Sequence, residues 1–528
     1  MGDTTTSYTT DLTGSYVQSS TGELDISIDA TNDGIDLLHI THTADLEGKL
    51  NIIMENVALL KAGQRDLTYL RADEGILNQN MELVAPVSAV AQFSFVADPA
   101  AAAEAAPMSF RAAADAVPPV AAAISMDVSY SGFGTLNNNQ TAIGSYIDRV
   151  QAAGSSPELA PMITGLFDLP TENDLAAAYD SMSPEVYTSS QRNLELSSSR
   201  FLETMFGCNQ LESSYKFNAD GEEIATNRTA YQTMEAEASK GAGEGQDAAK
   251  KESHLFWVNT TAGFYTSSQT SQYMGFTADT IDFSAGVQWA LTDEWYVGAA
   301  LGHTTYTTNF SDGISATSEG TSSQIGAYVA KLFGPTKVSL GIAGGVSEID
   351  VDRSNIFSAT GPASGELDSA FFATRFRVSH NFDLSDWYIR PFLDLGFSSI
   401  HNNSLTETGA GAMNLVIDAG TYNVFTVSPT LQVGWEIKSG SLSIRPNASI
   451  GYTRYSNSAP SFSATLQGDP GGVSSFDVSG LNDLDYLNTS GGIDLAFSNS
   501  VVFQFVYSGQ FSQNTSADNY QLKIVFPF

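Results

Sequence analysis

Apolar and polar positions alternate with a period of two through most of residues 253–528. In the stretch "WYVGAALGH", Trp295, Val297 and Leu301 share one face, and Gly298 lies on the other. Such alternation predicts strands whose two faces meet different environments. Twelve segments follow this pattern, at about 254–266, 272–290, 295–309, 320–333, 336–352, 366–382, 387–401, 421–437, 442–455, 485–497, 500–512 and 515–528.

Short and long connections alternate between these segments. The connections after the even-numbered segments are tight, as in "LTDE" and "GP", whereas those after segments 3, 5, 7 and 9 are long and polar, such as 402–420 and 456–484. Tight turns on one rim with longer loops on the other are typical of outer-membrane barrels. An even number of strands also places both ends of the barrel on one side of the membrane.

The two faces of the predicted strands differ in chemistry. One is apolar and ends in rim aromatics such as Trp387 and Trp435, while the other carries the charged residues Arg375, Arg377, Arg390, Asp394, Glu436 and Arg445. Twelve strands enclose more space than side chains fill easily, so we expect the charged face to line a lumen and the apolar face to meet lipid. Closure leaves no unpaired edge in the bilayer. Gly298 and Gly341 lie on the inward face, where a missing side chain leaves room for a segment to pass close to the wall; strand curvature is the alternative interpretation.

The N-terminal half is organised differently. Residues 1–130 begin with short, polar, strand-like runs and contain an Ala/Pro-rich stretch at 99–123, which we interpret as a flexible insertion or linker. A helical region follows at 131–207, and a Gly/Ala/Glu/Lys-rich stretch at 208–252 reads as a flexible linker before the barrel at 253–528.

Three helices are expected in the helical region. Asn139 is the predicted N-cap of the first, "ENDLAAAYDSM" forms the second, and the third spans 184–206. Ser183 and Pro184 suit the N-cap and first turn of this third helix. A helix and a tether placed before a lumen lined by small residues suggest that 184–206, 225–252 or both occupy the pore.

Composition excludes several classes of function. The formal charge is 23 − 59 = −36, which argues against nucleic-acid binding through phosphate contacts. The single cysteine, Cys208, has no partner for a disulfide, and no stretch suits a transmembrane helix. The start lacks the features of a signal peptide, so we expect a fragment whose natural N-terminus lies further upstream. No catalytic, phosphate-binding or metal motif occurs; His39 and His42 are expected on opposite strand faces, and we predict neither an enzyme nor a cofactor or metal site.

The order of these segments resembles the monomeric autotransporters, the type Va secretion proteins. The first segment resembles the last coils of a passenger β-helix, the junction resembles the family's Leu-x-x-Asn-Gln helix, and the next helix resembles the segment that enters the pore. The C-terminus is similar to the aromatic assembly signal of the family. The matching residues are, in that order, Gly14, Tyr16, Gln18, Gly22 and Leu24; Leu136, Asn139 and Gln140; Met182 to Glu185; and Tyr520, Leu522, Ile524, Phe526 and Phe528.

The resemblance implies a twelve-stranded outer-membrane translocator that delivers or anchors its passenger at the cell surface, with an N-terminal segment plugging the barrel. Its expected partners are outer-membrane lipid, the β-barrel insertion machinery, periplasmic chaperones and its own passenger, in a monomer. The expected pore-helix positions are Asn193, Ser197, Ser198 and Arg200. The Asn-Asn pair of self-cleaving members is absent from this helix, so self-cleavage is not predicted. The alternatives are a barrel-anchored adhesin or scaffold, and a diffusion porin for small solutes.

Overall fold

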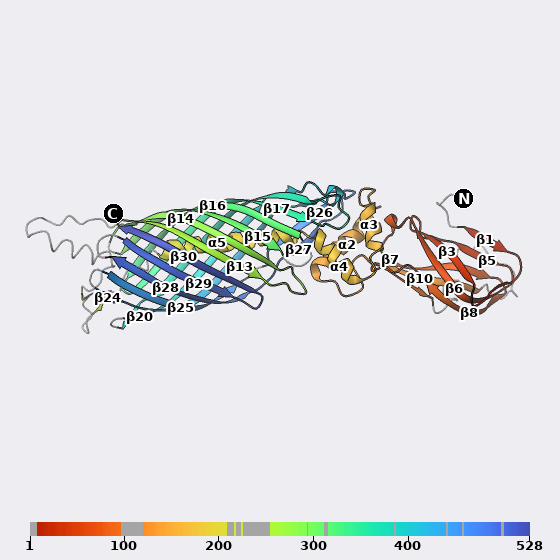
Figure 1. Cartoon of the computed structure of the whole chain (residues 1–528), viewed down its shortest axis with the longest axis horizontal. Coiled ribbons are helices and arrows are strands. Elements are labelled where there is room, and N and C mark those ends of the chain that lie inside the picture. The colour runs from red at the N-terminus through yellow and green to blue at the C-terminus, as the bar shows by residue number, and fades with distance from the viewer. Residues whose placement is uncertain are drawn as a thin grey trace, which may run out of the picture.

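The computed structural model describes residues 8–96, 120–207, 216–217, 223–224, 254–292, 294–310, 315–384, 387–439, 442–456, 459–497 and 501–527. Three regions follow one another along the long axis of the molecule (Figure 1). A β-solenoid lies at one end, a group of helices lies in the middle, and a barrel with a helix inside it lies at the other end. The expected segment 225–252, most of the linker and Phe528 lie outside the described residues.

The barrel is a closed antiparallel sheet. The hydrogen-bonded order runs from β18 down to β13, on through β30, β29, β28, β25 and β23 to β20, and the pairing of β18 with β20 closes it. Short extensions, β19 (Phe382–Leu384) and β24 (Ile437–Ser439), prolong two of these strands. The twelve barrel strands are β13 (His254–Ser267), β14 (Phe276–Ala290), β15 (Trp295–Phe310), β16 (Ser315–Phe333), β17 (Thr336–Ser354), β18 (Ala363–His380), β20 (Trp387–Asn402), β23 (Gly420–Trp435), β25 (Leu442–Tyr455), β28 (Asp485–Phe497), β29 (Val501–Phe511) and β30 (Thr515–Pro527).

The predicted alternation is visible in the exposure of successive residues. In β14, buried and exposed residues alternate from Phe276 to Phe283, with Ile281 and Phe283 more than half exposed on the outside. Trp295, Trp387 and Trp435 are likewise exposed, as an apolar surface with rim aromatics requires for contact with lipid. Among the described helices, none is both long and apolar enough to cross a membrane.

Residues 9–84 form the coils of the solenoid, and the strands of successive coils stack in parallel. One face stacks β1 (Thr9–Leu12), β5 (Leu37–Ile40) and β7 (Gly63–Ala72); the other stacks β2 (Tyr16–Gln18), β6 (Thr43–Glu55) and β8 (Gly75–Val84). β3 (Glu23–Asp29) pairs with the second half of β6 and with β4 (Gly34–Ile35). Aliphatic side chains such as Ile28, Leu46 and Leu50 point inwards and are fully buried, so each coil closes over an apolar core.

An antiparallel pair ends the solenoid. β10 (Val120–Val128) lies between β7 and β9 (Ala91–Phe95), antiparallel to both. The prediction of an insertion reaching residue 123 is therefore wrong at its C-terminal end. Ala121, Ala122 and Ala123 are buried strand residues, and their small side chains fit close packing that composition alone cannot distinguish from low complexity.

The helical region contains α2 (Asn138–Ala152), α3 (Ala160–Phe167), α4 (Glu172–Met182), the 3-10 turn η2 (Pro184–Tyr187) and α5 (Thr188–Gly207). The predicted N-cap of the first helix is wrong by two residues. Asn137 is the cap, and it forms a reciprocal capping box with Gln140, whereas Asn139 lies inside the helix and is buried. Ser183 does cap η2, accepting a hydrogen bond from the Glu185 amide.

Two long loops of the barrel build a further small sheet that the sequence did not predict. Its strands, in order, are β21 (Leu405–Thr406), β22 (Leu415–Ile417), β26 (Ser461–Leu466) and β27 (Phe476–Ser479). η1 (Val57–Leu59) lies in the solenoid, and η4 (Gly411–Met413) lies in the first of these loops. Two further short strands, β11 (Lys216–Phe217) and β12 (Glu223–Ile224), pair antiparallel with each other. We call this four-stranded sheet, with the loop residues 405–417 and 461–479 that build it, the outer cap.

Candidate functional site: the lumen and its helix

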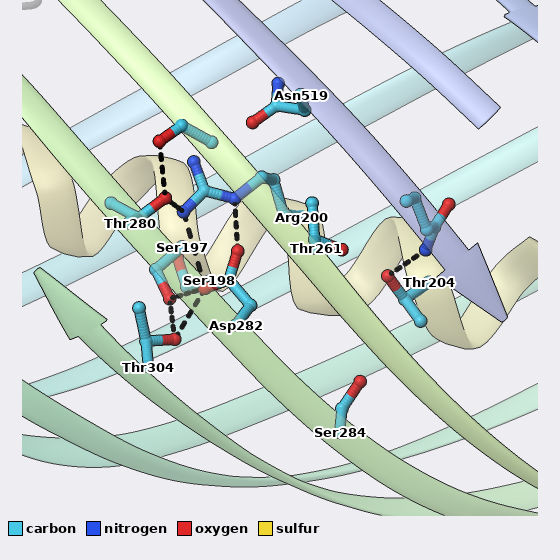
Figure 2. A network of polar contacts seen from close by, with 12 residues as sticks. Ser197, Ser198, Arg200, Thr204, Thr261, Thr280, Asp282, Ser284, Thr304 and Asn519 are labelled. Atoms are coloured by element: carbon cyan, nitrogen blue, oxygen red, sulfur yellow. Dashed lines mark hydrogen bonds and ion pairs between the residues drawn. The ribbon is translucent and has the colours of Figure 1, made fainter. Parts of the chain in front are cut away.

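Helix α5 lies inside the barrel (Figures 1 and 2). It enters at the end next to the other helices and the outer cap, and its C-terminal end points towards the end of the barrel where β13 begins and β30 ends. Unlike a surface helix, it is buried nearly all round. Its composition suits a polar lumen, since hydroxyl, amide and charged side chains alternate with a few large apolar ones.

One face of α5 is hydrogen-bonded to the barrel wall. The Arg200 guanidinium donates to Asp282, with Nε 2.8 Å from Oδ2, and to Thr280 Oγ1 at 3.0 Å. The Ser197 hydroxyl lies 2.8 Å from Thr304 Oγ1 (Figure 2). Charge-assisted bonds of this kind are stronger than neutral ones. These contacts tie the helix to β14 and β15.

Two other expected pore-helix residues contribute unequally. Asn193 Nδ2 donates to Thr308 Oγ1 at 3.1 Å, which adds a further contact with β15. Ser198 instead donates to the Glu195 carbonyl of its own helix at 2.9 Å. The hydrogen bond of this hydroxyl therefore stays within α5, because the preceding turn of the helix supplies the acceptor.

The opposite side of α5 meets charged residues of the wall. Glu203 is ion-paired with both Arg375 and Arg377, and Arg377 also binds Asp394, with Nε 2.6 Å from Oδ1. Ser199 accepts a hydrogen bond from Arg375 at 2.6 Å. The sequence predicted the three wall residues of this group, which side-chain alternation alone can place; it did not predict Glu203 as their partner.

The other expected lumen charges lie together nearer the end of the barrel where β13 begins and β30 ends. Arg445 pairs with Glu436, with Nη2 2.7 Å from Oε1. Arg390 reaches Gln432 at 3.3 Å and Asn381 at 3.3 Å. None of the three contacts α5 in the described hydrogen bonds, so the structure separates them from the cluster around Glu203.

Close packing against small wall residues completes the fit. A Cβ atom on Gly302 would lie 2.9 Å from the Phe201 ring, and one on Gly341 would lie 3.0 Å from the Phe206 ring. Gly341 thus lets α5 approach the wall, as the missing side chain predicts. Gly298 instead makes room for the ring of Tyr328 on the adjacent strand, which covers it in place of the helix.

The helix does not fill the whole lumen. A polar cavity of about 280 Å³ remains between α5 and the wall formed by β18 to β30. Serine, threonine, asparagine and glutamine side chains form much of its lining, together with Asp494 and Lys523. Lys523 donates to the Thr204 carbonyl at 2.7 Å, near the C-terminal end of α5, where cations interact well with the helix dipole.

At the end of the barrel next to the outer cap, a buried ion pair joins the barrel to the helices. Arg353 donates to Glu407 through Nε at 2.8 Å and Nη2 at 2.6 Å, and its Nη1 reaches the Ser181 carbonyl at 2.9 Å. The Tyr187 hydroxyl donates to Glu407 at 2.9 Å. The two charged side chains are 1% and 0% exposed, so the pair is fully desolvated. This group links β17, the outer cap, α4 and η2, and we call it the Arg353–Glu407 clasp.

A second buried carboxylate joins three segments at the same end. Glu185 accepts from Asn139 Nδ2 at 2.8 Å and from the Met274 amide at 2.7 Å. Asn139 also donates to the Ser479 carbonyl at 2.8 Å. Burial raises the pKa of Glu185 to about 7, against the opposing effect of these hydrogen bonds. Asn139 and Glu185, two of the residues that carry the family resemblance, therefore contact each other in the structure.

One apolar core runs through the solenoid, the helices and the outer half of the barrel. It contains Leu46 of the solenoid, Tyr146 of α2, Leu466 of the outer cap and Phe371 of the barrel. Such a continuous core gives the solenoid and the barrel a shared set of packing contacts in place of a bare tether.

The predicted terminal signal residues lie on the last strand. Tyr520, Leu522, Ile524 and Phe526 share its outward face, and β30 pairs with β13 through Val258 and Ile524 to close the barrel.

Among the described residues, no group of three or more His, Cys, Asp or Glu is arranged to hold a metal ion. His39 bonds to Asp11 and Asp73 on neighbouring coils.

Comparisons with known proteins agree on the barrel region. The family model described as autotransporter beta-domain matches residues 256–508. The chain is similar in structure to the translocator domain of the autotransporter NalP from Neisseria meningitidis, at 14% identity and a TM-score of 0.43, over 57% of this chain and 96% of that one. It is also similar to the transport unit of the autotransporter AIDA-I from Escherichia coli, at 12% identity and a TM-score of 0.38, over 57% and 98% of the two chains. No curated protein sequence matches the chain.

Proposed function

We propose that the barrel, whose residues 256–508 match the autotransporter beta-domain model, displays the solenoid of residues 8–95 at the cell surface and holds it there. One observation carries the proposal. α5 passes through the lumen and joins a solenoid at one end of the barrel to strand β13, which begins at the other end. A chain threaded in this way matches the end state of export through the barrel.

The outer contacts support anchoring over release. The Arg353–Glu407 clasp, the Asn139 and Glu185 contacts and the continuous apolar core all hold residues 138–187 against barrel strands and the outer cap. Breaking this interface would expose a buried ion pair and a large apolar surface, and each carries a substantial free-energy cost. The solenoid is therefore proposed as the retained end of a surface passenger, with 138–207 as the junction.

The proposal has finer parts, which concern the plug of the lumen and the assembly of the barrel. α5 acts as the plug of the lumen, and the residues that hold it are Asn193, Ser197, Arg200 and Glu203. The outward face of β30 meets lipid and supplies the signal for the insertion machinery, with periplasmic chaperones delivering the chain as a monomer. The proposed role is transport and anchoring without catalysis. A diffusion porin is disfavoured, since a helix occupies its pore.

Surface labelling tests this orientation. In a Cys208→Ser background, Val17→Cys places a thiol on the solenoid at a residue that is 72% exposed, and Glu294→Cys places one on the tight-turn rim. A membrane-impermeant maleimide should label Val17→Cys in intact cells, and should label Glu294→Cys only after the outer membrane is permeabilised. Labelling of the rim cysteine alone in intact cells would overturn the proposed orientation.

Retention has its own measurement. The wild-type solenoid should stay with washed cells after a protease site placed at 225–252 has been cut from the periplasmic side. Appearance of the solenoid in the medium would leave the orientation intact and refute the anchoring.

A further inference from the structure

Two tyrosines on adjacent barrel strands form a pocket that the export function does not explain. Tyr455 ends β25 and Tyr486 lies near the start of β28, and their ring centroids are 5.1 Å apart with an interplanar angle of 59°. The guanidinium carbon of Arg192 on α5 lies 4.8 Å from the Tyr455 ring centroid and 5.3 Å from that of Tyr486. A cation over two aromatic faces is strongly favoured when water is excluded.

Directional hydrogen bonds complete the coordination of this guanidinium. Nη2 of Arg192 donates to the Tyr486 hydroxyl at 2.9 Å, and Nη1 donates to Glu195 one helical turn further on, at 3.0 Å. The Arg192 side chain is 7% exposed and that of Glu195 is 3% exposed. The guanidinium is thus ion-paired with Glu195, stacked on the two rings and buried. A planar guanidinium fits this arrangement better than an ammonium group does.

The position of this pocket divides the lumen. The 280 Å³ polar cavity reaches Glu195 and Tyr455 at its outer end. On the other side of Arg192, the cavity shared with Tyr486, Tyr265 and Thr188 holds only about 20 Å³. Arg192 therefore sits between the polar cavity of the lumen and the closely packed region around Tyr265 and Thr188.

We propose that Tyr455 and Tyr486 form a guanidinium-binding site in the barrel wall, with Arg192 as its resident ligand and Glu195 as the counter-ion. The site fixes the register at which α5 rests. Hydroxyl pairs such as Ser197 with Thr304 can be remade when a serine-rich helix shifts by a turn, whereas a guanidinium between two rings can be replaced only by another guanidinium. Binding at this site is independent of whether residues 8–95 are a passenger.

Chemical rescue tests the site in the full chain. Arg192→Ala removes the atoms of N-ethylguanidinium, which is then titrated into the detergent-solubilised variant by calorimetry. We expect saturable binding to this variant and none to wild type, whose site is filled. Adding Tyr486→Phe should weaken binding by about tenfold or more, because a hydrogen bond to a charged group is lost. Arg200→Ala is the matched control, since that arginine binds Asp282 without an aromatic pocket, and it should not bind the probe.

Equal binding to Arg192→Ala and Arg200→Ala, or no binding to either folded variant, would overturn the proposal. If Arg192→Ala does not fold, a double-mutant cycle of Arg192→Lys and Tyr486→Phe on the unfolding rate replaces the titration. Non-additive effects would support the site, because lysine cannot form the same bonded stack. Additive effects would refute it.

Discussion

Removing Glu407 should open the outer cap without unfolding the barrel. The carboxylate accepts bonds from Arg353 Nε at 2.8 Å, Arg353 Nη2 at 2.6 Å, the Tyr187 hydroxyl at 2.9 Å and the Leu415 amide at 2.8 Å. Glu407→Ala leaves these donors without their acceptor and leaves a buried arginine unpaired. Losing one member of a buried ion pair costs about 3–5 kcal/mol.

This cost translates into a measurable change in local opening. At about 1.4 kcal/mol for each factor of ten, the opened fraction of the cap should rise by roughly a hundredfold to a few thousandfold. Amide hydrogen exchange reads this fraction directly. The amides of Asp418 and Gln467 suit the assay, because they are bonded within the outer cap to Ser463 and Asn414.

Two controls isolate the ion pair. Glu158→Ala changes an exposed carboxylate of the same helical region and should leave exchange of the cap unchanged. Arg353→Met combined with Glu407→Leu replaces the pair with apolar side chains of similar size and should recover most of the protection. Protection in Glu407→Ala within about twofold of wild type would refute the energetic role assigned to the clasp.

Two further perturbations address the junction and the lumen. Burial raises the pKa of Glu185 from 4.5 to about 7, so the folded junction binds the proton more tightly than the unfolded chain does. Its stability contribution, on the order of 3 kcal/mol, is fully present below pH 4.5 and is lost as the pH rises through 7. The protection factors of α2 amides, which are corrected for the base-catalysed intrinsic exchange rate, should therefore fall over that range. Glu185→Gln should flatten this fall in protection, whereas an unchanged slope would contradict the assignment. Gly302→Leu should displace Phe201 at a cost of about 1–3 kcal/mol and should therefore lower the melting temperature of the folded barrel. Gly420→Ala should leave the melting temperature unchanged, because nothing lies within 4 Å of the added Cβ. Equal stability of the two variants would refute the close packing of α5.

The barrel was predictable because its signal is local and repeated. Alternation fixes which face each strand residue occupies, so Arg375, Arg377 and Asp394 could be placed inside from the sequence alone. The partner of that group, Glu203, lies 172 residues away from Arg375. Its contact depends on the register of α5 in the lumen, which no pattern along the chain specifies.

The missed features have equally specific causes. The outer cap is built from strands of two to six residues inside polar loops, which are too short for periodicity to reveal. Asn137 and Asn139 belong to one run of three asparagines, so the choice of N-cap depended on packing: the buried bonds of Asn139 to Glu185 and Ser479 place it inside the helix. The role of Arg192 required two tyrosines brought together by the pairing of β25 with β28.

Helix α5 inside the lumen is the central claim, and a disulfide measures it most directly. The Ser197 and Thr304 hydroxyl oxygens lie 2.8 Å apart, so cysteines at these positions should be close enough to oxidise. In a Cys208→Ser background, Ser197→Cys with Thr304→Cys should cross-link in the membrane-embedded full chain. Ser199→Cys with Thr304→Cys should not, because Ser199 faces Arg375 on another strand. Cross-linking of neither pair, or of both equally, would contradict a helix docked in the barrel at this register.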